Sequence, residues 1–238
     1  MMTVELLYPE IANLYGELGN IEYMQRSVPA CDVRRTGLED RPAFLDGGVD
    51  LVYMGSMTER AQSVAAARLA PFREEIRRAV EEGQAFLITG NAMELFGTGI
   101  DDTDGTHVDG LGLFPFHTTR DMLGRYNSLY LGKYGDTDIV GYKSQFTQSF
   151  PDGPIPPLFE TVRGPGMNRQ TGPEGIRYKN FMATYLLGPL LILNPPFLVH
   201  LVESLTGNTP FPAFEQAAMA AYWARVAEYS DPRRGFTY

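Results

Sequence analysis

The sequence predicts an α/β protein in which helices pack against a sheet of buried strands. Strand-like and helix-like segments alternate through the first part of the chain. Two continuous apolar runs, DLVYM at residues 50–54 and AFLIT at residues 85–89, are typical of parallel strands that are covered on both faces. Shorter β segments, punctuated by glycine and proline, follow after residue 110.

The elements of the first half follow from local patterns. Apolar side chains recur at helical spacing between residues 61 and 82, which predicts a helix that breaks near Pro71 and ends at Gly83. We expect strands at residues 3–7, 50–54 and 85–89 and helices at residues 21–27 and 61–82.

The second half predicts more strands, followed by two closing helices. The last helix ends at the breaker pair Asp231 and Pro232. No internal repeat or linker is evident, so we expect a single domain over residues 1–238. The predicted strands cover residues 111–116, 128–131, 138–142, 159–163 and 177–183, and the helices cover residues 197–206 and 213–229.

Composition excludes several classes of function. The chain has 20 Lys and Arg against 29 Asp and Glu, a net charge of -9, and this acidic balance argues against nucleic-acid binding. The single cysteine, Cys31, excludes an internal disulfide, and the first residues lack a signal-peptide pattern, so we expect a cytoplasmic protein. Residues 181–202 carry no formal charge, but three prolines interrupt them, so we expect a buried strand, a turn and a helix and no membrane role.

Several motifs resemble one family, the class I glutamine amidotransferases of the cobyric-acid-synthase-like branch. Within that branch the likeness is greatest to the amidotransferase subunits of lipid II isoglutaminyl synthases. The matching segments are LLYPEIANLYGELGNIEYMQR at residues 6–26, GLGLF at 110–114, IVGY at 139–142, PEGIRYKN at 173–180 and TYLLGPLLILNP at 184–195.

The resemblance implies a flavodoxin-like fold, with a mostly parallel central sheet and helices on both of its faces. It also implies glutamine hydrolysis by a cysteine on a strand-to-helix elbow, with a histidine base and ammonia transfer to a synthetase. Here the elbow reads ITGNAMELFG, which puts Gly90 at the nucleophile position. The family's TYLHGPLL reads TYLLGPLL, so Leu187 occupies the base position and cannot accept a proton.

Other positions that the resemblance places in the pocket also differ. The glycine-rich turn after the third strand reads GSMTE at residues 55–59, and the elbow glutamine corresponds to Glu94. We interpret Cys31 as a buried, inert thiol and His107, His117 and His200 as residues of other segments. The expected former pocket comprises Gly55, Ser56, Gly90, Asn91, Glu94, Arg125, Lys143 and Leu187.

No other chemistry is strongly indicated. The acidic run at residues 101–110 has its glycine too early for an EF-hand, so we expect a solvated loop and no metal site. No dinucleotide fingerprint is present, and we expect no cofactor. A new nucleophile built from Thr89, Lys143 or Ser144 stays open as an alternative.

The sequence therefore predicts a catalytically degenerate amidotransferase-like subunit. The resemblance implies a Mur-ligase-like, ATP-dependent synthetase as its partner and peptidoglycan precursor amidation as its pathway. Two alternatives remain: an active enzyme whose pocket is adapted to another small amide or amino acid, and a sensor that binds a glutamine-type ligand without turnover.

Overall fold

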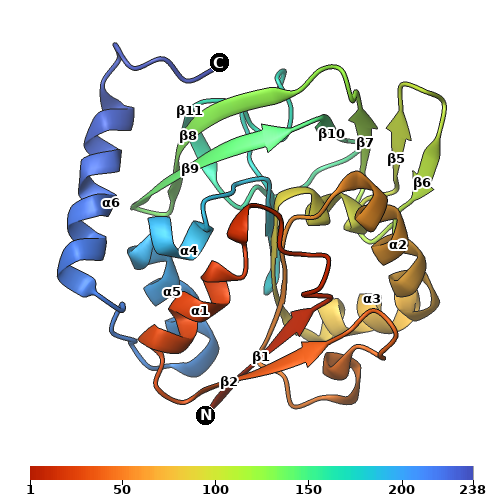
Figure 1. Ribbon diagram of the computed structural model, residues 1–238, viewed down its shortest axis with the longest axis horizontal. Helices are drawn as coiled ribbons and strands as arrows, with labels where there is room; N and C mark the ends of the chain where they lie inside the picture. Colours follow the sequence, from red (N-terminus) through yellow and green to blue (C-terminus); the bar gives the residue numbers. More distant parts are fainter. Residues whose placement is uncertain (238) are drawn as a thin grey trace.

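A computed structural model describes residues 1–237 and contains a central six-stranded sheet (Figure 1). Five of its strands run parallel, and the edge strand β12 runs antiparallel to β13. The strand order is β12-β13-β4-β3-β1-β2. The strands are β1 (Met2–Leu7), β2 (Cys31–Thr36), β3 (Leu51–Met54), β4 (Ala85–Thr89), β12 (Ile176–Tyr178) and β13 (Phe181–Thr184).

Helices cover both faces of this sheet, as the sequence predicted. Side chains alternate between faces along each strand, so Val52 packs in one core while Leu51 and Tyr53 pack in the other. The core containing Val52 is closed by α2 (Glu59–Leu69) and α3 (Arg73–Glu82). The opposite core is closed by α1 (Gly19–Ser27) and α5 (Pro195–Thr206), with the short α4 (Leu190–Leu193) between them.

The second half adds two smaller sheets, which the sequence predicted as extra β segments. One has the order β10-β7-β5-β6 and the other has the order β11-β8-β9. The C-terminal helix α6 (Glu215–Ser230) lies along one side of the molecule (Figure 1). The strands are β5 (Gly99–Asp102), β6 (His107–Asp109), β7 (Phe116–Arg120), β8 (Tyr126–Tyr134), β9 (Thr137–Gln145), β10 (Thr147–Pro151) and β11 (Glu160–Arg163).

Short 3-10 turns complete the chain and explain the break in the predicted helix at residues 61–82. Pro71 lies in such a turn between α2 and α3, and α3 ends at Gly83, which has a φ of 91°. The 3-10 segments are η1 (Leu14–Gly16), η2 (Ala43–Asp46), η3 (Ala70–Phe72) and η4 (Gly90–Phe96).

Three local predictions were wrong. Residues 111–115 form no strand, because the amides of residues 111–114 donate to the carbonyls of residues 95–97 instead of to a strand partner. The strand expected at 177–183 is the hairpin β12–β13, which turns at Lys179 with a φ of 51°. The acidic loop expected at 101–110 contains the ends of a second hairpin, β5–β6, with Gly105 at its turn.

The uncharged stretch at residues 181–202 forms β13, a turn, α4 and the start of α5. Its leucines at 190, 191, 198 and 201 are buried in the core beneath α1. Within residues 1–237, no helix is both long and apolar enough to cross a membrane.

Candidate functional site

A cavity of about 310 Å³ opens at the carboxyl ends of the parallel strands. One side of the cavity comes from segments that follow β1, β3, β4 and β13, the edge at which open α/β sheets bind ligands. The other side comes from Arg125 and from residues 144–147, where β9 ends and β10 begins. The lining residues are Leu14, Tyr15, Ser56, Met57, Glu59, Gly90, Asn91, Arg125, Ser144, Gln145, Phe146, Thr147, Tyr185 and Leu187.

Gly90 forms the sharp turn between β4 and η4. Its φ is 62°, in the left-handed region that favours glycine. A Cβ atom at this position would overlap the Cβ of Ser56 and would lie 3.1 Å from Cδ2 of Leu187. The turn therefore has the shape of a nucleophile elbow, but neighbouring side chains fill the space that a nucleophile would need.

Five residues of the expected former pocket line the cavity. They are Ser56, Gly90, Asn91, Arg125 and Leu187, which come from four separate segments of the chain. Leu187 is buried, and its backbone pairs with Tyr142 of β9. The structure thus brings the two presumed catalytic positions, Gly90 and Leu187, into one cavity as neighbours.

The other three expected residues do not line the cavity. Gly55 packs tightly, because a Cβ there would lie 2.7 Å from the carbonyl oxygen of Ala12 and 2.8 Å from Cβ of Glu17. Glu94 and Lys143 are fully buried and belong to polar networks that support the cavity walls.

The cavity wall also carries polar groups, among them the predicted Arg125 and its partner Tyr15. Arg125 donates a hydrogen bond of 2.7 Å to the Tyr15 hydroxyl, which joins η1 to the segment before β8. Gln145 is only 8% exposed, and its Oε1 has no hydrogen-bond partner within residues 1–237. A buried carbonyl oxygen without a donor is costly, so a hydrogen-bond donor that reached this oxygen would be stabilising.

Glu94 is the centre of a buried network behind the cavity. Gln62 Nε2 donates to its carboxylate at 2.7 Å and the Tyr185 hydroxyl donates at 3.0 Å. Thr147 also donates to it. Burial raises the pKa of Glu94, and the hydrogen bonds from Thr147 and Gln62 oppose that rise. Because Tyr185 and Thr147 line the cavity, this network fixes two of its walls.

Lys143 and Glu174 form a fully buried ion pair on the far side of Tyr185. The ammonium lies 5.5 Å from the ring centroid of Tyr130 and 5.7 Å from that of Tyr185. Glu174 also accepts hydrogen bonds from the Tyr185 amide and the Thr184 hydroxyl, each 2.8 Å long. Burial lowers the pKa of Lys143, and the Glu174 carboxylate opposes that change. With its ammonium paired, Lys143 is a structural cation and no base for the cavity.

Glu17 is a buried acid that sequence reasoning missed. Thr89 donates a hydrogen bond to its carboxylate, and the Tyr53 hydroxyl lies 3.2 Å from Oε2. Burial raises the pKa of Glu17 to about 7, and the bonds from Thr89 and Tyr53 oppose the rise. The neighbouring residues do not show that Glu17 is buried, because the side chains that enclose its carboxylate are distant in the sequence.

The remaining nucleophile and base candidates lie elsewhere. Cys31 begins β2 and pairs with Met2, at the amino end of the sheet. A strand rises about 3.3 Å per residue, so the length of β1 separates Cys31 from the cavity by roughly 16 Å. Of residues 1–237, no cysteine or histidine lines the cavity. Each of the three histidines has a partner elsewhere: His107 contacts Asp101, His117 contacts Asp152 and His200 contacts Thr137.

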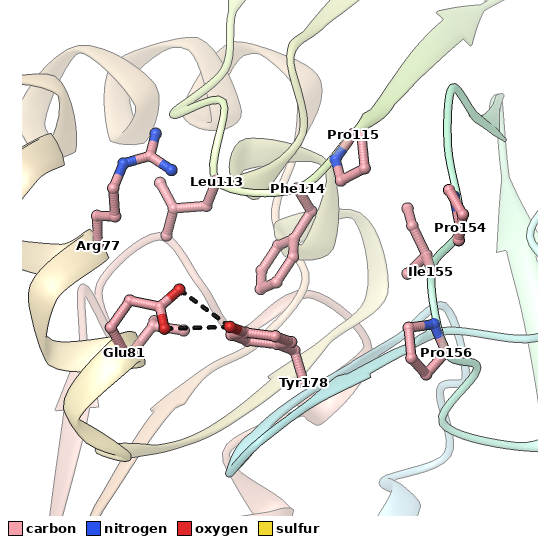
Figure 2. Close-up of a pocket in the computed structure, with 10 residues that line it drawn as sticks. Arg77, Glu81, Leu113, Phe114, Pro115, Pro154, Ile155, Pro156 and Tyr178 are labelled. Atoms are coloured by element: carbon pink, nitrogen blue, oxygen red, sulfur yellow. Dashed lines mark hydrogen bonds between the residues drawn. The ribbon is translucent and has the colours of Figure 1, made fainter.

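A second pocket, of about 230 Å³, shares no lining residue with the first. It lies between α3 and two loops at residues 113–115 and 154–156 (Figure 2). Its walls are mostly apolar, and its charged residues already have partners: Arg77 donates to the Gly112 carbonyl, and Glu81 accepts from the Tyr178 hydroxyl at 3.1 Å. No catalytic arrangement is present there.

No group of three or more His, Cys, Asp or Glu side chains that could hold a metal ion occurs within the part of the chain that the structure describes.

The fold is that of the class I glutamine amidotransferases. PurLQS from Thermotoga maritima aligns with 94% of this chain and 99% of its own, with a TM-score of 0.52 and 12% identity. A solved glutamine amidotransferase aligns with 86% of this chain and 99% of its own, with a TM-score of 0.52 and 14% identity. At these identities the likeness establishes the fold alone.

Sequence similarity identifies the family within this class. Residues 3–194 match the CobB/CobQ-like glutamine amidotransferase domain, so the chain belongs to that family. Subunit GatD of the glutamine-hydrolysing lipid II isoglutaminyl synthase of Staphylococcus aureus is 24% identical over 204 residues, 85% of this chain and 83% of that subunit. The GatD subunit of Streptococcus pneumoniae is 26% identical over 213 residues, 85% of this chain and 80% of its own.

Proposed function

We propose that this chain is a glutamine amidotransferase-like subunit that has lost glutaminase activity and acts through a partner protein. The observation that carries the proposal is the elbow. Gly90 occupies the turn, and Ser56 and Leu187 fill the space beside it. Covalent glutamine hydrolysis needs a nucleophile at this point and a base within hydrogen-bond reach. Glycine and leucine supply neither.

The position of Cys31 supports the same conclusion. It lies at the opposite end of the sheet, and burial together with the charges of Asp32 and Asp50 raises the pKa of its thiol. A raised thiol pKa reduces the fraction of reactive thiolate near neutral pH. Both its location and its electrostatics therefore make Cys31 a poor substitute nucleophile.

The names of the relatives supply the proposed partner and pathway. Both GatD proteins are subunits of a lipid II isoglutaminyl synthase. We infer that this chain likewise pairs with an ATP-dependent, Mur-ligase-like synthetase in peptidoglycan precursor amidation. The single-domain organisation and the cytoplasmic location expected from the sequence stay predictions.

Co-expression with that synthetase tests the assembly. We expect the two chains to elute together in size-exclusion chromatography at micromolar concentration. Separate elution of two folded proteins would contradict the subunit role.

The open cavity favours a second candidate function, the binding of a glutamine-type ligand without turnover. Arg125 and Glu59, two residues of opposite charge, line this cavity. Calorimetric titration with glutamine tests this candidate. Saturable heat without glutamate release would support it, and the absence of heat at millimolar glutamine would contradict it.

The three candidates for new chemistry support the adapted-enzyme alternative poorly. Lys143 is buried in an ion pair, and Thr89 is fully buried and does not line the cavity. Ser144 does line the cavity, but its hydroxyl donates to the side-chain amide oxygen of Asn127, which is no base.

A further inference from the structure

An unusually exposed leucine lies close to the cavity mouth, on the turn that joins β7 to β8. Leu123 is 98% exposed, and its neighbour Met122 is 42% exposed. The turn is held by Asp121, whose side chain accepts the Leu123 amide at 2.9 Å and whose carbonyl accepts the Gly124 amide at 3.0 Å. Local hydrogen bonds thus fix a backbone conformation that presents large apolar side chains to solvent.

Two guanidinium groups flank the segment that follows this turn. Arg125 lies 5.2 Å from the Phe146 ring centroid and is bonded to Tyr15. Arg169 lies 4.4 Å from the Tyr126 ring centroid. Neither has a carboxylate within 4.0 Å in residues 1–237. Stacking on an aromatic ring holds each guanidinium in place while leaving its N–H donors available.

These two arginines line an open basin beside the cavity. The basin has a volume of about 630 Å³ and also includes Tyr126, Asn127 and the backbone at residues 164–165. Arg125 lines both the basin and the cavity. Both cations border one basin, and neither is neutralised by an acidic partner among residues 1–237. Their surface complements an acidic one.

We propose that this rim, defined as Met122, Leu123, Arg125 and Arg169, is where the synthetase partner docks. The inference rests on the proposed function and deepens it by assigning the surface. Leu123 inserts into an apolar pocket on the partner, and partner carboxylates pair with the two guanidiniums. A stable interface buries about 800 Å² on each partner, so a protein seated on the rim and basin also covers the cavity mouth.

The exposed aromatic residues elsewhere fit this role less well. Phe211 and Trp223 are exposed, but neither lines the cavity or the basin. Phe211 lies in a groove with Met1, Met2 and Asp50, at the amino end of β1. This position makes Phe211 a matched apolar control for Leu123.

Binding of the purified synthetase to single-site variants tests the docking surface. Leu123→Ser and Arg169→Glu should each raise the dissociation constant at least about tenfold, as loss of an interface anchor does. The controls Phe211→Ser and Arg34→Glu, on the remote groove and on β2, should change it less than about twofold. Added salt should weaken wild-type binding more than it weakens binding by Arg169→Glu, because the lost cation removes a screened attraction.

The outcomes separate the two proposals. Tight wild-type binding that neither rim variant alters would overturn the docking surface while leaving the subunit role intact. Failure of the folded wild-type chain to bind the synthetase would overturn both. Leu123 is almost fully exposed, so its replacement removes no core contact, and unfolding curves of the variants should overlay that of the wild type.

Discussion

Ser56 occupies the space into which any side chain on Gly90 would extend. A Cβ atom on Gly90 would overlap the Cβ of Ser56, whose hydroxyl is held by a 2.9 Å hydrogen bond to the Leu14 carbonyl. In the proposed function, Gly90 stands at the nucleophile position, so Ser56 fills the space that a nucleophile there would need. Installing a nucleophile and a base at Gly90 and Leu187 would therefore also require a smaller residue at Ser56.

Reactivation is the first prediction. The double variant Gly90→Cys, Leu187→His should release glutamate at background rates, because Ser56 crowds the new cysteine. Adding Ser56→Gly should raise the rate at least about tenfold over the double variant, since a cysteine–histidine pair is worth several orders of magnitude when correctly placed. A coupled glutamate assay measures both. Equal rates in the two variants would show that Ser56 is not the obstacle.

Glu17 predicts a pH-dependent stability. Its pKa is about 7 when folded, against an ordinary value of 4.5. Between these values the folded chain holds a proton that the unfolded chain has released, so Glu17 lowers stability as pH rises through this range. The full loss is about 3 kcal/mol above pH 7.

Glu17→Gln removes this dependence and is the matched variant. In urea unfolding, the stability of Glu17→Gln relative to the wild type should rise between about pH 4.5 and about pH 7, by up to about 3 kcal/mol, and then level off. A constant difference between the two proteins across that range would contradict the raised pKa.

The Lys143–Glu174 pair predicts a large stability effect. Lys143→Met leaves a buried carboxylate unpaired and should cost about 3–5 kcal/mol of unfolding free energy. The double variant Lys143→Met, Glu174→Gln should recover much of this loss. Lys179→Met, which breaks the exposed pair with Glu81, should cost less than about 1 kcal/mol. Comparable losses for Lys143→Met and Lys179→Met in urea unfolding would contradict this ranking.

The central sheet was predictable because its signals are local. The apolar runs at 50–54 and 85–89 and the helical spacing before Gly83 depend on neighbouring residues, and β3, β4 and α3 appear where these patterns fall. The hairpin at β12–β13 was missed because Lys179, at its turn, has a positive φ. Nothing in the sequence indicates this conformation in a non-glycine residue.

The sequence predicted only part of the site, because burial depends on contacts between residues that are distant in the sequence. The motif resemblance pointed to Gly90, Leu187, Ser56, Asn91 and Arg125, which the structure places in one cavity. It could not distinguish a lining residue from a supporting one, because Glu94 and Lys143 are buried by contacts more than twenty residues away. Glu17 lies within the matching segment at residues 6–26, but the motif does not show that its carboxylate is buried, because that burial depends on Tyr53 and Thr89.

Glutamate release by the assembled chain and synthetase tests the central claim most directly, because amidotransferase activity can depend on the partner. The two purified proteins would be assayed with glutamine and ATP, alongside a Cys31→Ala version of this chain. The account predicts background glutamate release that Cys31→Ala leaves unchanged. Sustained release that disappears in the Cys31→Ala protein would contradict it, by showing that an active thiol reaches glutamine after all.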